Sequence, residues 1–99
     1  YNFTTMAEKL SKEDFIARVS TVNAAVSSMG KHYTYRVDGK TCLVHRVEAG
    51  TDWEIDLDEL YTIYCKIPDE KITTTSLKVY LRATQSPALA LMKAAKVLS

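Results

Sequence analysis

The chain has 99 residues, of which 46% are hydrophobic and 25% charged, and its formal net charge is +1. This size and composition predict one compact domain over residues 1–99 and argue against a disordered chain or a polycation. No apolar run approaches the roughly 20 residues of a membrane-spanning helix, so we expect no membrane partner. We also expect residues 1–10 to be flexible, with residues 1–5 preceding a natural start at Met6.

A long amphipathic helix is predicted over residues 12–29. Ser11 is followed three residues later by Asp14, which approximates a capping box, and Gly30 is a typical helix stop. Between them, apolar residues recur at spacings of four and three. These residues are Phe15, Val19, Val22, Val26 and Met29. The stripe is too short for a coiled coil, so we expect it to pack on the domain's own sheet.

A β-hairpin is predicted over residues 32–47. Asp38-Gly39 is a strong signal for a two-residue turn, because both central residues of a type I′ turn need positive φ. This turn would place His32 opposite His45. The alternation of apolar residues predicts the face that packs on the core. That face holds Tyr33, Tyr35, Val37, Cys42 and Val44.

A third strand over residues 51–55 and a helix over residues 57–65 should follow. Asp56 is the predicted N-cap of this helix, with Glu59 at the capping-box position. Acids in the first turn also suit the positive end of the helix dipole.

The last third of the chain leaves one segment ambiguous. Apolar and polar residues alternate over 74–83 as in a strand, yet the same segment also fits a helix capped by Thr74 or Thr75. The chain should end in a helix over residues 87–98, with Pro87 at its first position. The predicted fold is therefore α+β, a small antiparallel sheet packed with three helices, and residues 74–83 are its possible further strand.

The final helix motivates the first functional hypothesis. Apolar residues surround most of its circumference, so it should be buried centrally or against another chain. We therefore expect a small cytoplasmic binding protein without catalytic activity, which forms a homodimer or docks to a protein partner. The predicted interface residues are Leu89, Leu91, Met92, Val97 and Leu98.

The second hypothesis is a nucleic-acid-binding accessory or regulatory factor. Residues 31–47 have four bases and one acid beside two tyrosines, and single strands bind sheets that offer cations and aromatic rings. If residues 74–82 form a helix, the last two helices would resemble a helix-turn-helix. The candidate residues are Lys31, Arg36, Lys40, Arg46, Lys78, Arg82, Lys93 and Lys96.

The third hypothesis is a metal-dependent hydrolase in the acidic segment 48–59, which has six acids and no base. Asp52, Glu54 and Asp56 alternate, so their oxygens could line one strand face as ligands. An exposed edge strand followed by a helix cap explains the same acids, so we predict no metal site and no cofactor. The chain also has no recognisable nucleophile motif, which favours a protein that is not an enzyme.

The two cysteines, Cys42 and Cys65, are expected to be free thiols of a cytoplasmic protein. Together with His32 and His45 they do not match the spacing of a zinc site.

Overall fold

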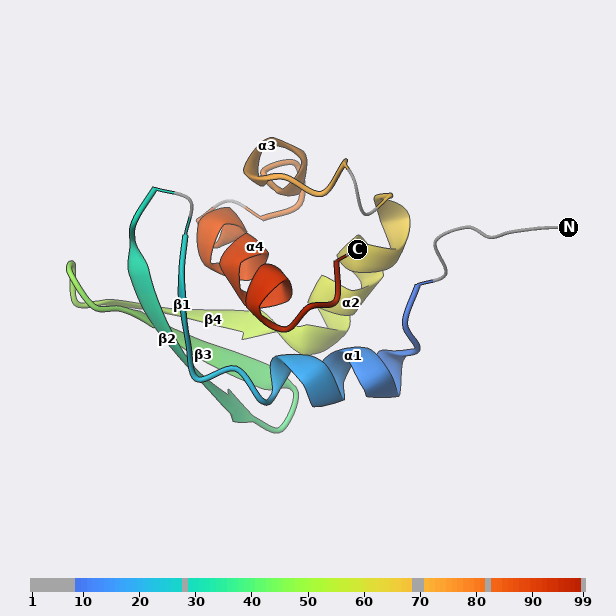
Figure 1. Cartoon of the computed structure of the whole chain (residues 1–99), viewed down its shortest axis with the longest axis horizontal. Helices are drawn as coiled ribbons and strands as arrows, with labels where there is room; N and C mark the ends of the chain where they lie inside the picture. The colour runs from blue at the N-terminus through green and yellow to red at the C-terminus, as the bar shows by residue number, and fades with distance from the viewer. Residues whose placement is uncertain (1–8, 28, 69–70, 82, 99) are drawn as a thin grey trace, which may run out of the picture.

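The computed structural model describes residues 9–27, 29–68, 71–81 and 83–98 (Figure 1). The predicted α+β class is confirmed, because a four-stranded antiparallel sheet packs with helices. In chain order the elements are α1 (Lys12–Val19), β1 (Ala24–Val26), β2 (His32–Asp38), β3 (Thr41–Arg46), β4 (Thr51–Asp56), α2 (Leu57–Lys66), α3 (Thr74–Leu77) and α4 (Gln85–Ala94). Within the described residues, none of these helices is long and apolar enough to cross a membrane. The predicted flexible start lies mostly in residues 1–8, outside the described residues.

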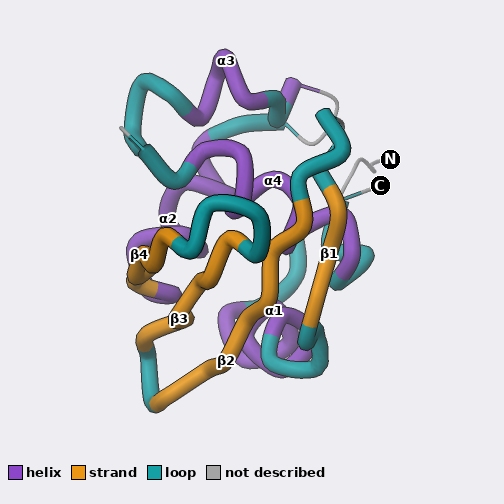
Figure 2. The backbone as a smooth tube through the Cα atoms, turned by 90° about the vertical axis from the view of Figure 1, so that its left-hand side faces the viewer, coloured by secondary structure: helices purple, strands orange, loops and turns teal. Residues whose placement is uncertain are grey.

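The sheet has the strand order β1-β2-β3-β4, so each strand pairs with its neighbours in the sequence. In Figure 2 the strands lie in front of α1, α2 and α4, whereas α3 lies beyond the upper end of the sheet and packs on α4. Burial alternates accordingly: Tyr33 and Tyr35 are buried under the helices, whereas Thr34 and Arg36 are exposed on the opposite side. One face of the sheet is therefore the floor of the core, and the other is open.

The core lies between the sheet and the helical layer. Phe15 of α1 packs against Tyr64 of α2 with 4.8 Å between ring centroids, and both side chains are fully buried. Leu91 of α4 is also fully buried. The buried Tyr35 hydroxyl donates a 2.8 Å hydrogen bond to the Pro87 carbonyl, which joins the sheet to α4. The predicted core face of the hairpin is confirmed.

The first helix is shorter than the prediction of residues 12–29. It ends at Val19, where the Ser20 and Thr21 hydroxyls donate to the carbonyls of Ile16 and Arg18. Such side-chain bonds compete with helix continuation. The chain then turns, and residues 24–26 form β1 against β2. The first three positions of the predicted stripe are buried, whereas Val26 and Met29 are 57% and 79% exposed.

The hairpin is confirmed, but its predicted turn and register are wrong. Asp38 pairs with Thr41, so the turn residues are Gly39 and Lys40, and His45 lies opposite Thr34 rather than His32. Gly39 has φ +63°, and Lys40 is not among the described residues with positive φ. This is the pattern of a type II′ turn, which needs glycine only at its first central position. The pairing moves by two residues, so the predicted faces are preserved.

The remaining elements also differ in detail from the predictions. Residues 74–77 form a short helix capped by Thr73, not a strand, because the Thr73 hydroxyl accepts the N–H of Ser76 and ends the extended chain. The final helix spans residues 85–94 instead of 87–98. Pro87 is tolerated within the first turn, where N–H groups lack helical partners in any case.

The early end of α4 has a specific cause. The N–H groups of Lys96 and Val97 donate to the carbonyls of Lys93 and Met92, and Lys96 has φ +59°. This is a Schellman motif with lysine at the position that glycine usually occupies. The reversal ends the helix and places Val97 back in the core, where it is 4% exposed.

Candidate binding face of the sheet

The open side of β2, β3 and β4 presents two cross-strand rows of side chains, which we call the outer face. In one row Thr34, His45 and Asp52 lie opposite one another, and in the other Arg36, Leu43 and Glu54 do. The rows line a shallow hollow of about 420 Å³. Apolar and charged groups thus share one concave surface that none of the described elements covers.

The outer face contains charges that the fold leaves unpaired. Leu43 is half-buried between its cross-strand neighbours Arg36 and Glu54. Neither of these two residues forms an ion pair or a side-chain hydrogen bond within the described residues. An exposed cation and an exposed anion flanking an aliphatic side chain can each form a new ion pair without breaking an existing one.

His45 lies beside this hollow in a fixed orientation. Its Nδ1 is 2.7 Å from Oδ1 of Asp52, directly across the strand pair. The carboxylate holds the ring through one nitrogen and leaves Nε2 for another partner. Among the described residues, neither histidine forms a hydrogen bond to a hydroxyl or thiol that could act as a nucleophile.

A second histidine–carboxylate pair lies at the end of the hairpin. The carboxylate of Glu48 accepts hydrogen bonds from the His32 ring and from the His32 backbone N–H. The ring hydrogen bond, supported by the backbone hydrogen bonds, lowers the pKa of Glu48 to about 2. Glu48 and Asp52 thus hold the two imidazoles toward different neighbours, and the two rings have no common ligand.

The acidic residues of segment 48–59 have different structural roles. Asp56 accepts the N–H groups of Asp58 and Glu59 as the predicted N-cap of α2, while Asp52 holds His45. Among the described residues, no three His, Cys, Asp or Glu side chains gather in a way that could hold a metal ion. Glu54 is the acid of β4 that remains open to a ligand.

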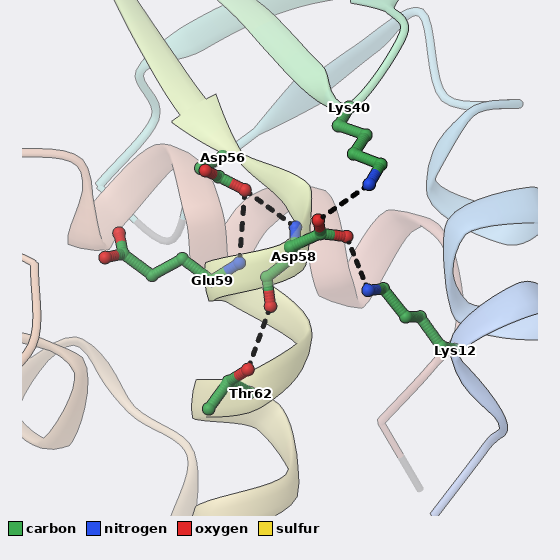
Figure 3. Close-up of polar contacts among 6 residues, drawn as sticks. All are labelled: Lys12, Lys40, Asp56, Asp58, Glu59 and Thr62. Atoms are coloured by element: carbon green, nitrogen blue, oxygen red, sulfur yellow. Dashed lines mark hydrogen bonds and ion pairs between the residues drawn. The ribbon is translucent and has the colours of Figure 1, made fainter.

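Lys40 belongs to a cluster at the start of α2 (Figure 3). The Asp58 carboxylate lies 2.7 Å from Nζ of Lys12 and 3.4 Å from Nζ of Lys40. The Lys12 contact, followed by Lys40, holds the pKa of Asp58 below its ordinary value. The Lys40 carbonyl also accepts the Leu57 N–H at 2.8 Å. This cluster connects α1, the hairpin turn and α2.

The other predicted nucleic-acid contacts do not gather on one surface. Lys78, Lys93 and Lys96 are exposed in the helical layer, whereas Arg36 is on the outer face. Arg46 is half-buried at the end of β3, and its buried Nε has no hydrogen-bond partner in the part of the chain that the structure describes. Lys31 is half-buried just before β2, and Arg82 lies outside the described residues.

The two hairpin tyrosines, predicted to face the core, and the residues of the predicted interface both lie inside the chain. Tyr33 and Tyr35 are only 4% and 5% exposed on the covered side of the sheet. Burial raises the pKa of Tyr35 above its ordinary value. The interface residues of the C-terminal segment are buried in the chain's own core, with Leu98 half-buried at its margin. They are Leu89, Leu91, Met92, Val97 and Leu98.

The two cysteines are free and lie in different environments. Cys42 is buried at the centre of the sheet, and burial raises the pKa of its thiol to about 11. Cys65 of α2 is exposed. The neighbouring Cys65 side chain raises the pKa of Tyr61, whose hydroxyl donates a 2.9 Å hydrogen bond to the Leu10 carbonyl.

Sequence reasoning missed the partners of the two histidines and the apolar centre of the outer face. The available signals were weak: Glu48 lies in the turn after β3, Asp52 follows that turn in β4, and Leu43 interrupts a polar face. Comparison with protein families, curated proteins and solved structures finds no match to this chain. The geometry and charges of the sheet are therefore the basis for a function.

Proposed function

We propose that this chain is a small non-catalytic binding protein that docks a protein partner on the outer face of its sheet. The observation that carries the proposal is the hollow between Arg36, Leu43 and Glu54, whose two charged side chains have no ion-pair partner among the described residues. An apolar contact flanked by opposite charges offers both affinity and a defined orientation to a protein ligand.

The size and composition of the hollow support binding. Its volume of about 420 Å³ is within the range of ligand sites, and its walls combine Leu43 with a few polar groups. His45, oriented by Asp52, adds a ring nitrogen that can donate or accept a hydrogen bond. The open shape of the hollow suits a side chain or an extended segment better than an enclosed small molecule.

The proposal includes a cytoplasmic location. The two cysteines are free thiols, and one of them is exposed on α2. Exposed thiols persist in a reducing compartment, where disulfides are rare.

Selection of random peptides displayed on phage against the immobilised protein tests this function. We expect enriched peptides whose binding weakens at least about tenfold with Leu43→Arg, because a charge then replaces the apolar centre. Arg36→Glu should weaken the same peptides by reversing one of the flanking charges. Circular dichroism would verify that both variants remain folded.

Lys93→Glu is the matched control, because Lys93 is exposed on α4 in the helical layer. It should leave the binding of the selected peptides unchanged. Enriched peptides that are insensitive to Leu43→Arg and Arg36→Glu but sensitive to Lys93→Glu would overturn the proposal. A selection that yields no specific peptide would overturn it as well.

A further inference from the structure

The β4 strand ends the sheet next to the outer face. In the strand order β1-β2-β3-β4 it pairs only with β3, and Figure 2 shows it at one side of the sheet. An edge strand has a row of backbone N–H and C=O groups directed away from the sheet. These groups can pair with an added strand of another chain.

The register identifies which residues have these open backbone groups. The Leu57 N–H donates to the Lys40 carbonyl, one residue beyond the last pair of β4 and β3. Because bonded and non-bonded pairs alternate in an antiparallel ladder, Ile55, Trp53 and Thr51 are then bonded to β3. The N–H groups of Asp52, Glu54 and Asp56 point outward, as do the carbonyls of Asp52 and Glu54.

The same residues have acidic side chains on the outer face. Asp52 is 77% exposed and contacts His45, Glu54 is exposed without a partner in the described residues, and Asp56, the N-cap of α2, is exposed at the end of the strand. The segment 48–59 itself contains no base, and His45 of β3 contacts Asp52 but not Glu54. Pairing of this edge with a second copy would place carboxylates against carboxylates, and like charges opposite each other destabilise a sheet.

The inner side of β4 offers an apolar contact. Trp53 is half-buried there, with 6.4 Å between its ring centroid and that of Tyr33. A strand added at this edge would place alternate side chains beside Trp53 and the others beside Asp52 and Glu54. The edge therefore complements a strand with apolar and cationic residues in alternation.

We infer that the β4 edge binds an extended basic segment of a partner protein by β-strand addition. Backbone hydrogen bonds to Asp52 and Glu54 hold the segment, and its lysine or arginine side chains pair with the acids of the outer face. This inference rests on the proposed function and names the chemistry of its partner.

Titration with the peptide acetyl-Lys-Val-Lys-Val-Lys-Val-amide tests the inference by amide hydrogen exchange and NMR shifts. The amides of Asp52 and Glu54 should become at least about tenfold more protected, as paired amides do. Those of Trp53 and Ile55, already bonded to β3, should change little. Trp53 is the only tryptophan, so its fluorescence should follow the same binding curve.

Matched peptides separate backbone pairing from charge. The same peptide with N-methyl groups along one edge keeps its lysines but cannot form the ladder, so it should not protect Asp52 and Glu54. Glu54→Gln should weaken binding by about two- to fivefold, as expected for one exposed ion pair. Glu59→Gln, which removes an exposed acid from α2, should have no effect.

A neutral Thr-Val peptide distinguishes this inference from the proposed function. If it binds β4 as tightly as the lysine peptide, the basic partner is wrong but the open sheet still binds protein segments. Equal binding of the N-methylated peptide, or protection elsewhere in the chain, would overturn strand addition. The proposed function fails separately, when the displayed peptides do not depend on Arg36 and Leu43.

Discussion

The two edges of the sheet are built differently. β4 has six residues, and three of them are acids with open backbone groups. β1 has only three residues, Ala24, Ala25 and Val26, and no charge. Neither edge has a further strand paired with it among the described residues, yet one edge is long and charged and the other is short and apolar. Natural sheets use both charge and shortness to avoid unwanted pairing.

The difference shows which edge can select a partner. Beside β1, an apolar hollow of about 310 Å³ is lined by residues that include Val26 and Val47, which are 57% and 53% exposed. The three residues of β1 itself carry no charge that could select one partner over another. On β4 the carboxylates reject a second copy and favour a cationic strand, so charge supplies the specificity.

The largest effect is expected from a substitution in the helical layer, which supports both edges of the sheet. Leu91→Asp should unfold the chain, because it buries a carboxylate at a fully enclosed site and costs roughly 4 kcal/mol or more. Far-UV circular dichroism and sedimentation would show the loss of both structure and compactness. Leu91→Met, as a control of similar volume, should cost less than about 1.5 kcal/mol. A folded aspartate variant would contradict the burial of Leu91.

A smaller effect is expected at the turn that joins the two central strands. Gly39→Val should destabilise the fold by about 1 kcal/mol or more, because a β-branched residue resists φ +63°. No atom outside the adjacent residues lies within 4 Å of an added Cβ, so strain and not a clash is the cause. Urea unfolding measures the change. Gly39→Asn, which tolerates positive φ better, should lose less.

A double substitution in β4 can remove the difference in charge between the two edges. Replacing Asp52 and Glu54 with valine should make the protein associate as its concentration rises, because residues 52–55 of the β4 edge then form a continuous apolar run. Unfolding free energy should change by only about 0.5 kcal/mol. Light scattering would detect the association. The double variant Glu13→Val and Glu59→Val removes two exposed acids from helices and should remain at its original mass.

The smallest expected effect is a change in how stability depends on pH, and it concerns Glu48 in the turn after β3. The pKa of Glu48 falls from 4.5 to about 2 on folding, so its carboxylate stabilises the fold above pH 4.5. This stabilisation is lost as the pH falls toward 2. Glu48→Gln should therefore lose less stability over that interval in urea unfolding. Glu13→Gln, on an exposed site of α1, is the control and should keep the slope of the parent chain.

Several features of the fold were predictable because they depend on local patterns. The alternation in 32–47 identified the buried face, and Asp56 identified the start of α2. The faces were correct despite the wrong register because a shift of two residues returns each side chain to the same side.

Other features depend on contacts that the local pattern does not contain. Ala24 and Ala25 favour helices by propensity, yet pairing with Tyr33 and Thr34 makes them part of a strand. Leu98 fits a helical stripe, but Lys96 in a left-handed conformation ends α4 first. The candidate site was only partly predictable, since Arg36 and the acids were identified but the pairing of His45 with Asp52 depends on the register.

Because Cys42 is buried, the reactivity of its thiol can report when the strands of the sheet separate. Cys42 lies on β3 between Val37 and Ile55, and its pKa of about 11 keeps the thiol protonated near neutral pH. An alkylating reagent should therefore modify exposed Cys65 first and Cys42 only when the central strands separate. The rate of the second modification, measured by mass spectrometry, would show how often the central strands of the sheet separate. The edge strands can bind a partner without this separation.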